Sequence, residues 1–323
     1  MSFSTYRYLL MTTDPVHIGT GGMRLGRVDN SIVREPGTRL PKIPGTSLSG
    51  AIRSYAAYRY GKRRCAGQGV EKDRRKGHCG LSKCPICYTF GSVKGDSAFS
   101  GVVSIGDARL LLFPVYSMVG PVWVTSPSIL RDFGIEDQSV DDNKAKWNGV
   151  TNQSHLNLGW LMVEKDDGDW TVPEELPNSA CSRIVLISDK LFSQVVNSNL
   201  EVRTSVAINP ETGAAEDGAL FTYEAIPRAT FLWMDVVVDD FRGKFPATTK
   251  KYDKNKGDNG DNQGLDLGVS WNNPGDVINA ALEWANHLGI GGMGTRGFGR
   301  LKNIDCRQLY PTETPCQEET HAS

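Results

Sequence analysis

The chain has 323 residues, of which 39% are hydrophobic and 23% are charged, as in ordinary globular proteins with a sizeable core. Its 36 basic and 37 acidic side chains give a formal net charge of −1, so any nucleic-acid binding has to come from local charge. No apolar run approaches the roughly 18 residues that span a membrane, and the N-terminal stretch lacks the basic and apolar regions of a secretory signal. We therefore expect a cytoplasmic protein with no membrane partner.

The first elements lead from a strand into polar loops. Residues 4–12 are expected to form a strand, and residues 16–22 (VHIGTGG) a strand end that runs into a glycine loop. His17 has the chemistry of a general base, but an isolated histidine is more often structural, and we favour that interpretation. Asp29 follows in a polar loop, where a lone aspartate is normally solvated or caps a turn.

A helix is expected directly after a Pro-Gly turn. Thr46 or Ser47 is positioned to cap a helix over residues 48–60. A helix start with free amides and the hydroxyls of Ser47 and Ser49 suits an anion, and Arg53 adds a charged donor about one turn later. The arrangement suits a phosphate of a nucleic-acid backbone, although an ordinary capped helix is the plainer interpretation.

Four cysteines lie within 23 residues in a basic lobe over residues 61–92. Their spacing, one cysteine and then three that end in a tight C-x2-C pair, suits a tetrahedral zinc site. His78 could replace the second cysteine as a ligand. No open coordination position or nearby base is evident, so the zinc would be structural and would fold the lobe. Four unrelated reduced thiols are the less favoured alternative. The expected ligands are Cys65, Cys79, Cys84 and Cys87.

Three later stretches carry further signals. Residues 201–225 read as two strands with a long Gly/Pro/Asp tip, a β-hairpin. Residues 243–265 are poor in hydrophobic side chains and read as a mobile insertion. In residues 289–301 the glycines would let the backbone approach a ligand, and Arg296 and Arg300 supply charge. The stretch follows a helix and enters a strand, so it is not a dinucleotide-binding motif.

Several motifs together resemble the RAMP proteins of CRISPR systems. The chain reads PxHxGTG, then VDxxIxRE, then LPxIPGTSLxGAIR, and residues 289–301 (GIGGMGTRGFGRL) match the glycine-rich signature near the end of RAMP folds. Residues 106–130 are similar to the backbone subunit of type III-B (Cmr) effector complexes. The matches cover most of the chain in the same order.

The resemblance implies one RAMP domain over residues 1–323 with an α+β fold. Its core would be a ferredoxin-like (RRM-type) antiparallel sheet with helices on one face. Three insertions would decorate this core: the basic zinc-knuckle lobe at 61–92, a thumb hairpin at 201–225 and the mobile loop at 243–265. The thumb would insert between guide and target strands, where apolar side chains can wedge bases apart.

The resemblance also implies an endoribonuclease activity. Asp29 stands at the position of the aspartate that supports target-RNA cleavage in the backbone subunits of type III complexes. Such a carboxylate can accept a proton from the 2′-hydroxyl or hold a divalent cation, Mg2+ or Mn2+. Glu35 is a possible helper. Cleavage of complementary target RNA would then occur at regular intervals along the complex.

The implied partners are a guide RNA (crRNA), a target RNA, other CRISPR effector subunits and further copies of the chain stacked head-to-tail, a contact that builds filaments. Guide RNA would contact a set of basic and hydroxyl side chains. The predicted RNA-binding residues are Arg34, Lys42, Ser47, Ser49, Arg53, Arg296 and Arg300.

Three other functions are compatible with the same residues. One is a guide-binding backbone subunit of the same fold that does not cleave. Another is a CRISPR-RNA processing endoribonuclease with His17 as the base. The least favoured is a zinc-dependent enzyme unrelated to RNA.

Overall fold

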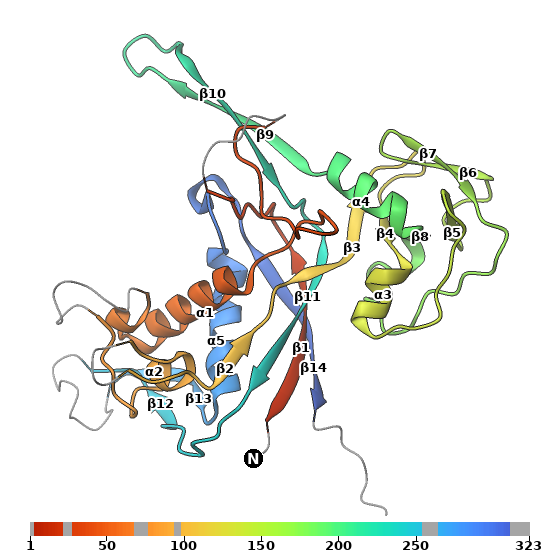
Figure 1. The fold of residues 1–323 in the computed structure, drawn as a ribbon. Helices are drawn as coiled ribbons and strands as arrows, with labels where there is room; N and C mark the ends of the chain where they lie inside the picture. The colour runs from red at the N-terminus through yellow and green to blue at the C-terminus, as the bar shows by residue number, and fades with distance from the viewer. Residues whose placement is uncertain (1–2, 22–27, 68–76, 94–97, 254–263, 311–323) are drawn as a thin grey trace, which may run out of the picture.

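The computed structural model describes residues 3–21, 28–67, 77–93, 98–253 and 264–310. Its main element is a ten-stranded sheet in the order β14-β1-β11-β3-β4-β8-β5-β7-β6, with β2 paired to β11 (Figure 1). The strands are β1 (Ser4–Thr12), β2 (Val103–Ile105), β3 (Arg109–Val115), β4 (Val122–Thr125), β5 (Lys144–Trp147), β6 (His155–Leu158), β7 (Leu161–Lys165), β8 (Ile184–Ile187), β11 (Phe231–Val238) and β14 (Leu301–Tyr310).

The two halves of this sheet differ in strand direction. In the first half β1, β3, β11 and β14 pair antiparallel, and helices α1 (Gly45–Tyr60) and α5 (Pro274–Leu288) lie beside them and pack on each other (Figure 1). In the second half β4 pairs parallel with β8, and β5 with β7. The α+β class is confirmed, but the sheet is mixed rather than antiparallel. Parallel neighbours need a crossover connection, and the chain between β4 and β8 provides one through α3 (Pro127–Phe133) and strands β5 to β7.

The core runs through both halves of the sheet and includes buried residues of α1 and α5. Leu48, Ile52 and Ala56 follow one another at every fourth position of α1 and are fully buried. Leu10 of β1 and Leu232 of β11 are equally buried. This packing fixes where the start of α1 lies relative to the sheet.

The start of α1 differs from expectation. The helix begins at Gly45 with Pro44 as its N-cap residue, and the side chain of Pro44 makes no capping hydrogen bond, so the predicted cap by Thr46 or Ser47 is wrong. The reason is that the carboxylate of Asp107 accepts the first amide, from Gly45, at 2.7 Å. An acidic group from another segment thus does the work of the cap.

The predicted hairpin over residues 201–225 is confirmed. Strands β9 (Glu201–Ile208) and β10 (Ala215–Ala225) pair antiparallel and project from the body of the protein (Figure 1). At its base, Asn30 bridges in parallel to Tyr223. Helix α4 (Asp189–Ser198) leads into this hairpin from the second half of the sheet.

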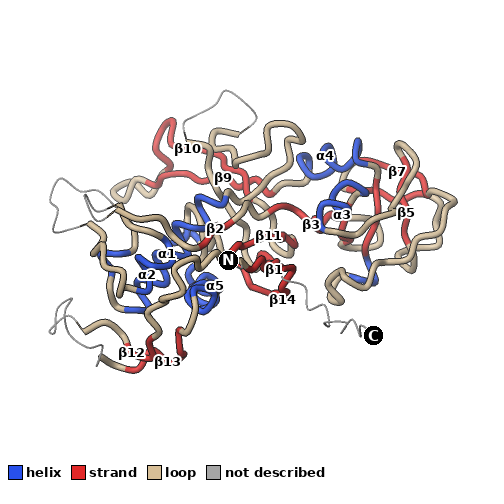
Figure 2. The backbone as a smooth tube through the Cα atoms, turned by 60° about the horizontal axis from the view of Figure 1, so that its bottom comes forward, coloured by secondary structure: helices blue, strands red, loops and turns tan. Residues whose placement is uncertain are grey.

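The other two predicted insertions lie together on the side of α1. Helix α2 (Pro85–Phe90) belongs to the lobe at 61–92, and β12 (Thr248–Lys250) pairs with β13 (Asp266–Trp271) beside it (Figure 2). Part of the predicted basic lobe, residues 68–76, and part of the predicted mobile loop, residues 254–263, lie outside the described residues. Among the helices that are described, each is too short or too polar to cross a membrane.

Candidate nucleic-acid interface and metal centre

Asp29 lies against the base of the hairpin. Its backbone N–H donates to Thr222 Oγ1 at 3.1 Å, and its Oδ2 accepts from the Thr222 N–H at 2.7 Å and from Thr222 Oγ1 at 2.9 Å. The backbone hydrogen bond from Thr222, followed by the one from its hydroxyl, holds the pKa of Asp29 below its ordinary value. The side chain is partly exposed. The structure therefore presents an ionised carboxylate where the hairpin leaves the body.

Arg34 also contacts the hairpin base. Its guanidinium donates to Glu224 Oε2 at 2.9 Å and to Asn197 Oδ1 at 2.9 Å, and the Arg34 and Glu224 side chains are only 15% and 14% exposed. The ion pair joins the segment after Asp29 to β10 and to α4. That Arg34 binds RNA stays a prediction; in the structure its guanidinium makes this contact within the chain.

His17 packs on the same base of the hairpin. Its Nδ1 lies 2.6 Å from the carbonyl oxygen of Glu224, and the residue is 6% exposed. Its ring meets Tyr223 edge-on at a centroid distance of 6.1 Å. These contacts agree with the structural role that we favoured for His17.

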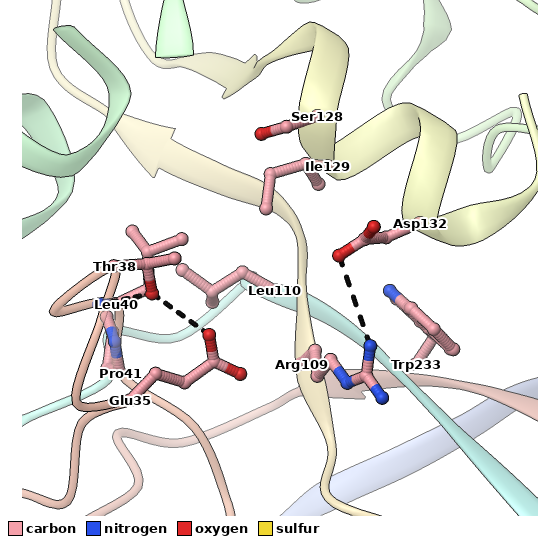
Figure 3. A pocket seen from close by; sticks show the side chains of 10 residues that line it. All are labelled: Glu35, Thr38, Leu40, Pro41, Arg109, Leu110, Ser128, Ile129, Asp132 and Trp233. Carbon is pink, nitrogen blue, oxygen red and sulfur yellow. Dashed lines mark hydrogen bonds and ion pairs between the residues drawn. The ribbon is translucent and has the colours of Figure 1, made fainter. Parts of the chain in front are cut away.

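Glu35 belongs to a different pocket (Figure 3). It accepts a hydrogen bond from Thr38, while Arg109 and Asp132 lie 4.0 Å apart across the pocket beside Trp233. The cavity of about 130 Å3 is smaller than the roughly 300–1,000 Å3 of typical ligand pockets. We place no chemistry there, and Glu35 is not brought to Asp29 by any described contact.

The start of α1 is partly occupied by the chain itself. Asp107 Oδ2 accepts from Lys42 Nζ at 2.5 Å, while its Oδ1 takes the Gly45 amide. Burial opposes the charged form of Asp107, but Lys42 and Gly45 outweigh it, so its pKa is lowered. The first amide of the helix was predicted to be free for a phosphate, and Lys42 was predicted to contact RNA. In the structure both groups donate to the Asp107 carboxylate. The hydroxyls of Ser47 and Ser49 remain half-buried on the first turn.

Arg53 connects α1 to the cysteine lobe. Its guanidinium donates to three carbonyl oxygens, those of Cys65 at 2.8 Å, Phe90 at 3.3 Å and Gly91 at 3.0 Å. Burial lowers the pKa of Arg53, and the nearby cysteines oppose this effect. Arg53 was predicted to contact RNA, and its donors serve this junction.

The four predicted cysteines converge on one point. Their Sγ atoms all lie within 4.8 Å of one another and are buried. The distances are 3.6 Å from Cys79 to Cys87, 3.7 Å from Cys87 to Cys65 and 3.9 Å from Cys84 to Cys65. A tetrahedron with metal–sulfur bonds of about 2.3 Å has edges of about 3.8 Å, whereas a disulfide needs about 2.05 Å. The cluster can therefore hold a metal ion.

His78 is not part of this cluster. Its Nε2 lies 2.9 Å from the carbonyl oxygen of Gly67. Burial lowers the pKa of His78, followed by the effect of Arg53. The histidine supports the lobe from outside the four sulfurs, and Cys79 keeps its place among them.

The glycine-rich stretch packs against the chain itself. Gly292 donates its N–H to the carbonyl of His17 at 3.0 Å, and Gly299 donates to that of Pro15 at 2.8 Å. Gly291 has φ +94° and a Cβ there would lie 2.6 Å from the carbonyl oxygen of His17. The glycines thus allow close approach to this strand end, which the ligand interpretation did not anticipate.

The two arginines of this stretch differ in surroundings. Arg300 forms an ion pair with Asp14 and its side chain is 50% exposed. Arg296 is exposed, and its guanidinium lies 5.5 Å from the ring centre of Phe221 on the hairpin. Arg296 and Asp29 therefore both adjoin β10.

Thr222, Asp107 and Glu224 are site residues that sequence reasoning missed. Thr222 is 193 positions from Asp29, and no local motif links them. Asp107 lies in the sequence GDAR, which carries no signal for a contact with the start of α1. These partners become visible only when the sheet brings distant segments together.

The comparisons with known proteins agree with this architecture. The model of the RAMP superfamily matches residues 9–302, so the chain belongs to the RAMP superfamily. More particularly, it is 30% identical over 256 residues to the CRISPR system Cmr endoribonuclease Cmr4 of Pyrococcus furiosus, covering 71% of this chain and 80% of that protein. It is 39% identical over 90 residues to the CRISPR system Cms endoribonuclease Csm3 of Methanothermobacter thermautotrophicus, covering 27% of this chain and 32% of that one.

Solved structures show the same fold. A chain in the cryo-EM structure of the type III-B Cmr-beta bound to cognate target RNA aligns with a TM-score of 0.63 at 15% identity, covering 94% of this chain and 96% of that one. The crystal structure of oligomeric Cmr4 from Pyrococcus furiosus aligns with a TM-score of 0.54 at 21% identity, covering 94% and 98%. At these identities the likeness concerns the fold alone.

Proposed function

We propose that the protein is the repeated backbone subunit of a type III-B CRISPR ribonucleoprotein and that it cleaves target RNA. The observation that carries the proposal is the ionised Asp29 held at the base of a projecting hairpin. The similarity to Cmr4, which is named an endoribonuclease, supports it. The antiparallel half of the sheet would correspond to the ferredoxin-like core, and the cytoplasm is the expected location.

The reaction we propose uses the target's own 2′-hydroxyl. A bond forms between O2′ and phosphorus as the bond from phosphorus to O5′ breaks, leaving a 2′,3′-cyclic phosphate and a 5′-hydroxyl. The 2′-hydroxyl loses a proton, the 5′-oxygen gains one, and the charge on the phosphorane needs stabilisation. Asp29 would stand beside this linkage.

The hydrogen bonds of Asp29 favour an electrostatic role over a proton-accepting one. Its lowered pKa makes it a weak base at neutral pH. Both hydrogen bonds from Thr222 go to Oδ2, and none of the hydrogen bonds among the described residues ends on Oδ1. Oδ1 would hold a divalent cation, Mg2+ or Mn2+, which supplies Lewis-acid stabilisation of the phosphorane when bound.

Guide and target RNA would lie where the hairpin leaves the body. The hairpin tip carries exposed apolar side chains, among them Val206, Ile208 and Leu220, which suit a wedge between bases. The hydroxyls of Ser47 and Ser49 and the exposed Arg296 are the predicted RNA contacts with the fewest competing partners in the described chain. Further copies and other effector subunits would complete the assembly.

The cysteine cluster would bind a structural zinc ion. On binding, zinc would displace the thiol protons that form the hydrogen bonds between the sulfurs. Arg53 would then transmit the order of this lobe to α1 through the carbonyls of Cys65 and Gly91.

The test is target cleavage by the reconstituted complex with guide RNA. Wild-type complex should cut complementary RNA at regular intervals in the presence of Mg2+ or Mn2+, and Asp29→Ala should bind it without cutting. Equal cutting by the two would contradict the catalytic role and leave the backbone subunit that does not cleave. Incubating the isolated protein with repeat RNA without metal tests the processing alternative. We expect no cleavage, because His17 is buried against Glu224.

A further inference from the structure

We propose that Thr222 is a positioning residue that ties the Asp29 carboxylate to the hairpin, an inference that rests on the proposed function. One residue of β10 makes three hydrogen bonds with Asp29. Two of them end on the same carboxylate oxygen, and the third receives the Asp29 amide.

The hydroxyl of Thr222 both donates and accepts a hydrogen bond in this arrangement. A threonine hydroxyl has one proton to donate and two lone pairs to accept with. The proton goes to Asp29 Oδ2, while a lone pair takes the Asp29 N–H. Because both contacts are with the same residue, they set the side-chain torsion of Asp29 as well as its backbone position. Hydrogen bonds to an ionised carboxylate are stronger than hydrogen bonds between neutral groups.

The segment of Asp29 is joined to β10 by an isolated parallel bridge between Asn30 and Tyr223. The N–H of Asn30 donates to the Thr222 carbonyl at 3.0 Å, and the N–H of Glu224 donates to the Asn30 carbonyl at 3.0 Å. The position of Asp29 is therefore defined by the hairpin on one side.

The part of β10 that carries Thr222 is firmly anchored. Neighbouring side chains of a strand point to opposite faces, and Tyr223, the next residue, is 4% exposed. It meets Phe298 of the glycine-rich stretch edge-on at a centroid distance of 5.4 Å. Thr222 thus projects from a fixed strand toward Asp29, so the carboxylate and the base of the hairpin form one unit.

Under the proposed function, one aspartate acts on each phosphodiester linkage of the target that a hairpin distorts, and this unit would keep the two together. The hairpin would decide which linkage is distorted, and Thr222 would place Oδ1 of Asp29 beside that linkage rather than elsewhere. Any displacement of the hairpin base would carry the carboxylate with it. A positioning error of about 1 Å can lower a rate by about a hundredfold.

The test compares variants at position 222 in the reconstituted complex with guide RNA. Thr222→Val keeps the branched shape and loses the hydroxyl, while Thr222→Ser keeps the hydroxyl and loses the methyl group. Thr222→Ala is measured beside them, so that two small residues with and without a hydroxyl are compared even where the valine variant does not assemble. Thr5→Val, on β1 at the end away from the hairpin, is the matched control (Figure 1).

Two quantities are measured separately, the affinity for target RNA and the single-turnover cleavage rate with target at saturation. We expect Thr222→Val and Thr222→Ala to lower the rate at least about tenfold, the factor that corresponds to one lost bond of about 1.4 kcal/mol. Guide loading and target affinity should be unchanged. Thr222→Ser and Thr5→Val should cleave within about twofold of wild type, a change of under about 0.5 kcal/mol.

Equal rates for the serine and alanine variants, whether high or low, would overturn the positioning role. A loss of target affinity that accounts for the whole loss of rate would also overturn it. Failure of the proposed function has a different signature: Asp29→Ala would then cleave as wild type does. The proposal at Thr222 fails alone when Asp29→Ala abolishes cleavage and the alanine variant at 222 does not impair it.

Discussion

Gly45 and Gly50 lie five residues apart in α1, and replacing each by alanine should change the free energy of unfolding in opposite directions. A Cβ on Gly45 would collide with the carbonyl oxygen of Ile105 and lie 3.0 Å from the carbonyl carbon of Gly106, both backbone atoms that cannot turn aside. The helix start would have to move away from β2, which would break the bond from Gly45 N–H to Asp107. A Cβ on Gly50 meets nothing within 4 Å.

The expected magnitudes follow from these contacts. Crowding of a packed site costs about 1–3 kcal/mol and a hydrogen bond to a charged group contributes about 1.5–3 kcal/mol, so Gly45→Ala should lower the free energy of unfolding by about 3 kcal/mol or more. Gly50→Ala should raise it by about 0.5–1 kcal/mol through helix propensity. Urea unfolding of the isolated chain, followed by circular dichroism, measures both. Similar midpoints for the two variants would refute this account of how the start of α1 is held.

Three further outcomes test other parts of the structure. Cys84→Ser should abolish stoichiometric zinc in the purified protein and lower its unfolding temperature, whereas Cys306→Ser, at an exposed position, should change neither; zinc retained by Cys84→Ser would contradict the four-sulfur centre. Because the pKa of Asp107 is lowered, its charged form adds stability at neutral pH that is lost as the pH falls below roughly 4; the stability difference between wild type and Asp107→Asn should therefore shrink between pH 7 and pH 3, and a constant difference would contradict the pairing. A double-mutant cycle with Arg34→Ala and Glu224→Gln should give a coupling energy of about 1 kcal/mol or more, since the pair is largely buried; purely additive effects would show that the ion pair contributes nothing.

Local patterns predicted the features whose cause is local. The spacing of Cys65, Cys79, Cys84 and Cys87 is enough to predict a site of four thiols, and the structure brings their sulfurs together. The hairpin follows from two β-forming runs around a turn-rich tip. In both cases the relevant contacts join residues close in the chain.

Features that depend on distant segments could not be predicted. Arg34 and Arg53 read as free charges in a basic stretch, but their partners are Glu224 and a set of backbone carbonyls, and carbonyls carry no signal in a sequence. The bond of Asp29 to Thr222 joins residues 193 positions apart. The parallel pairing in the second half of the sheet likewise depends on crossovers that strand propensity does not specify.

The central claim is that each copy of the chain contributes one carboxylate, Asp29, to cleavage of the target. Complexes assembled from mixtures of wild-type and Asp29→Asn chains test it most directly, through the pattern of target-RNA fragments on a denaturing gel. The account predicts the same cleavage positions at every ratio, with the total rate falling in proportion to the wild-type fraction and reaching zero with the variant alone. Undiminished fragments from complexes that contain only the Asp29→Asn chain would contradict it.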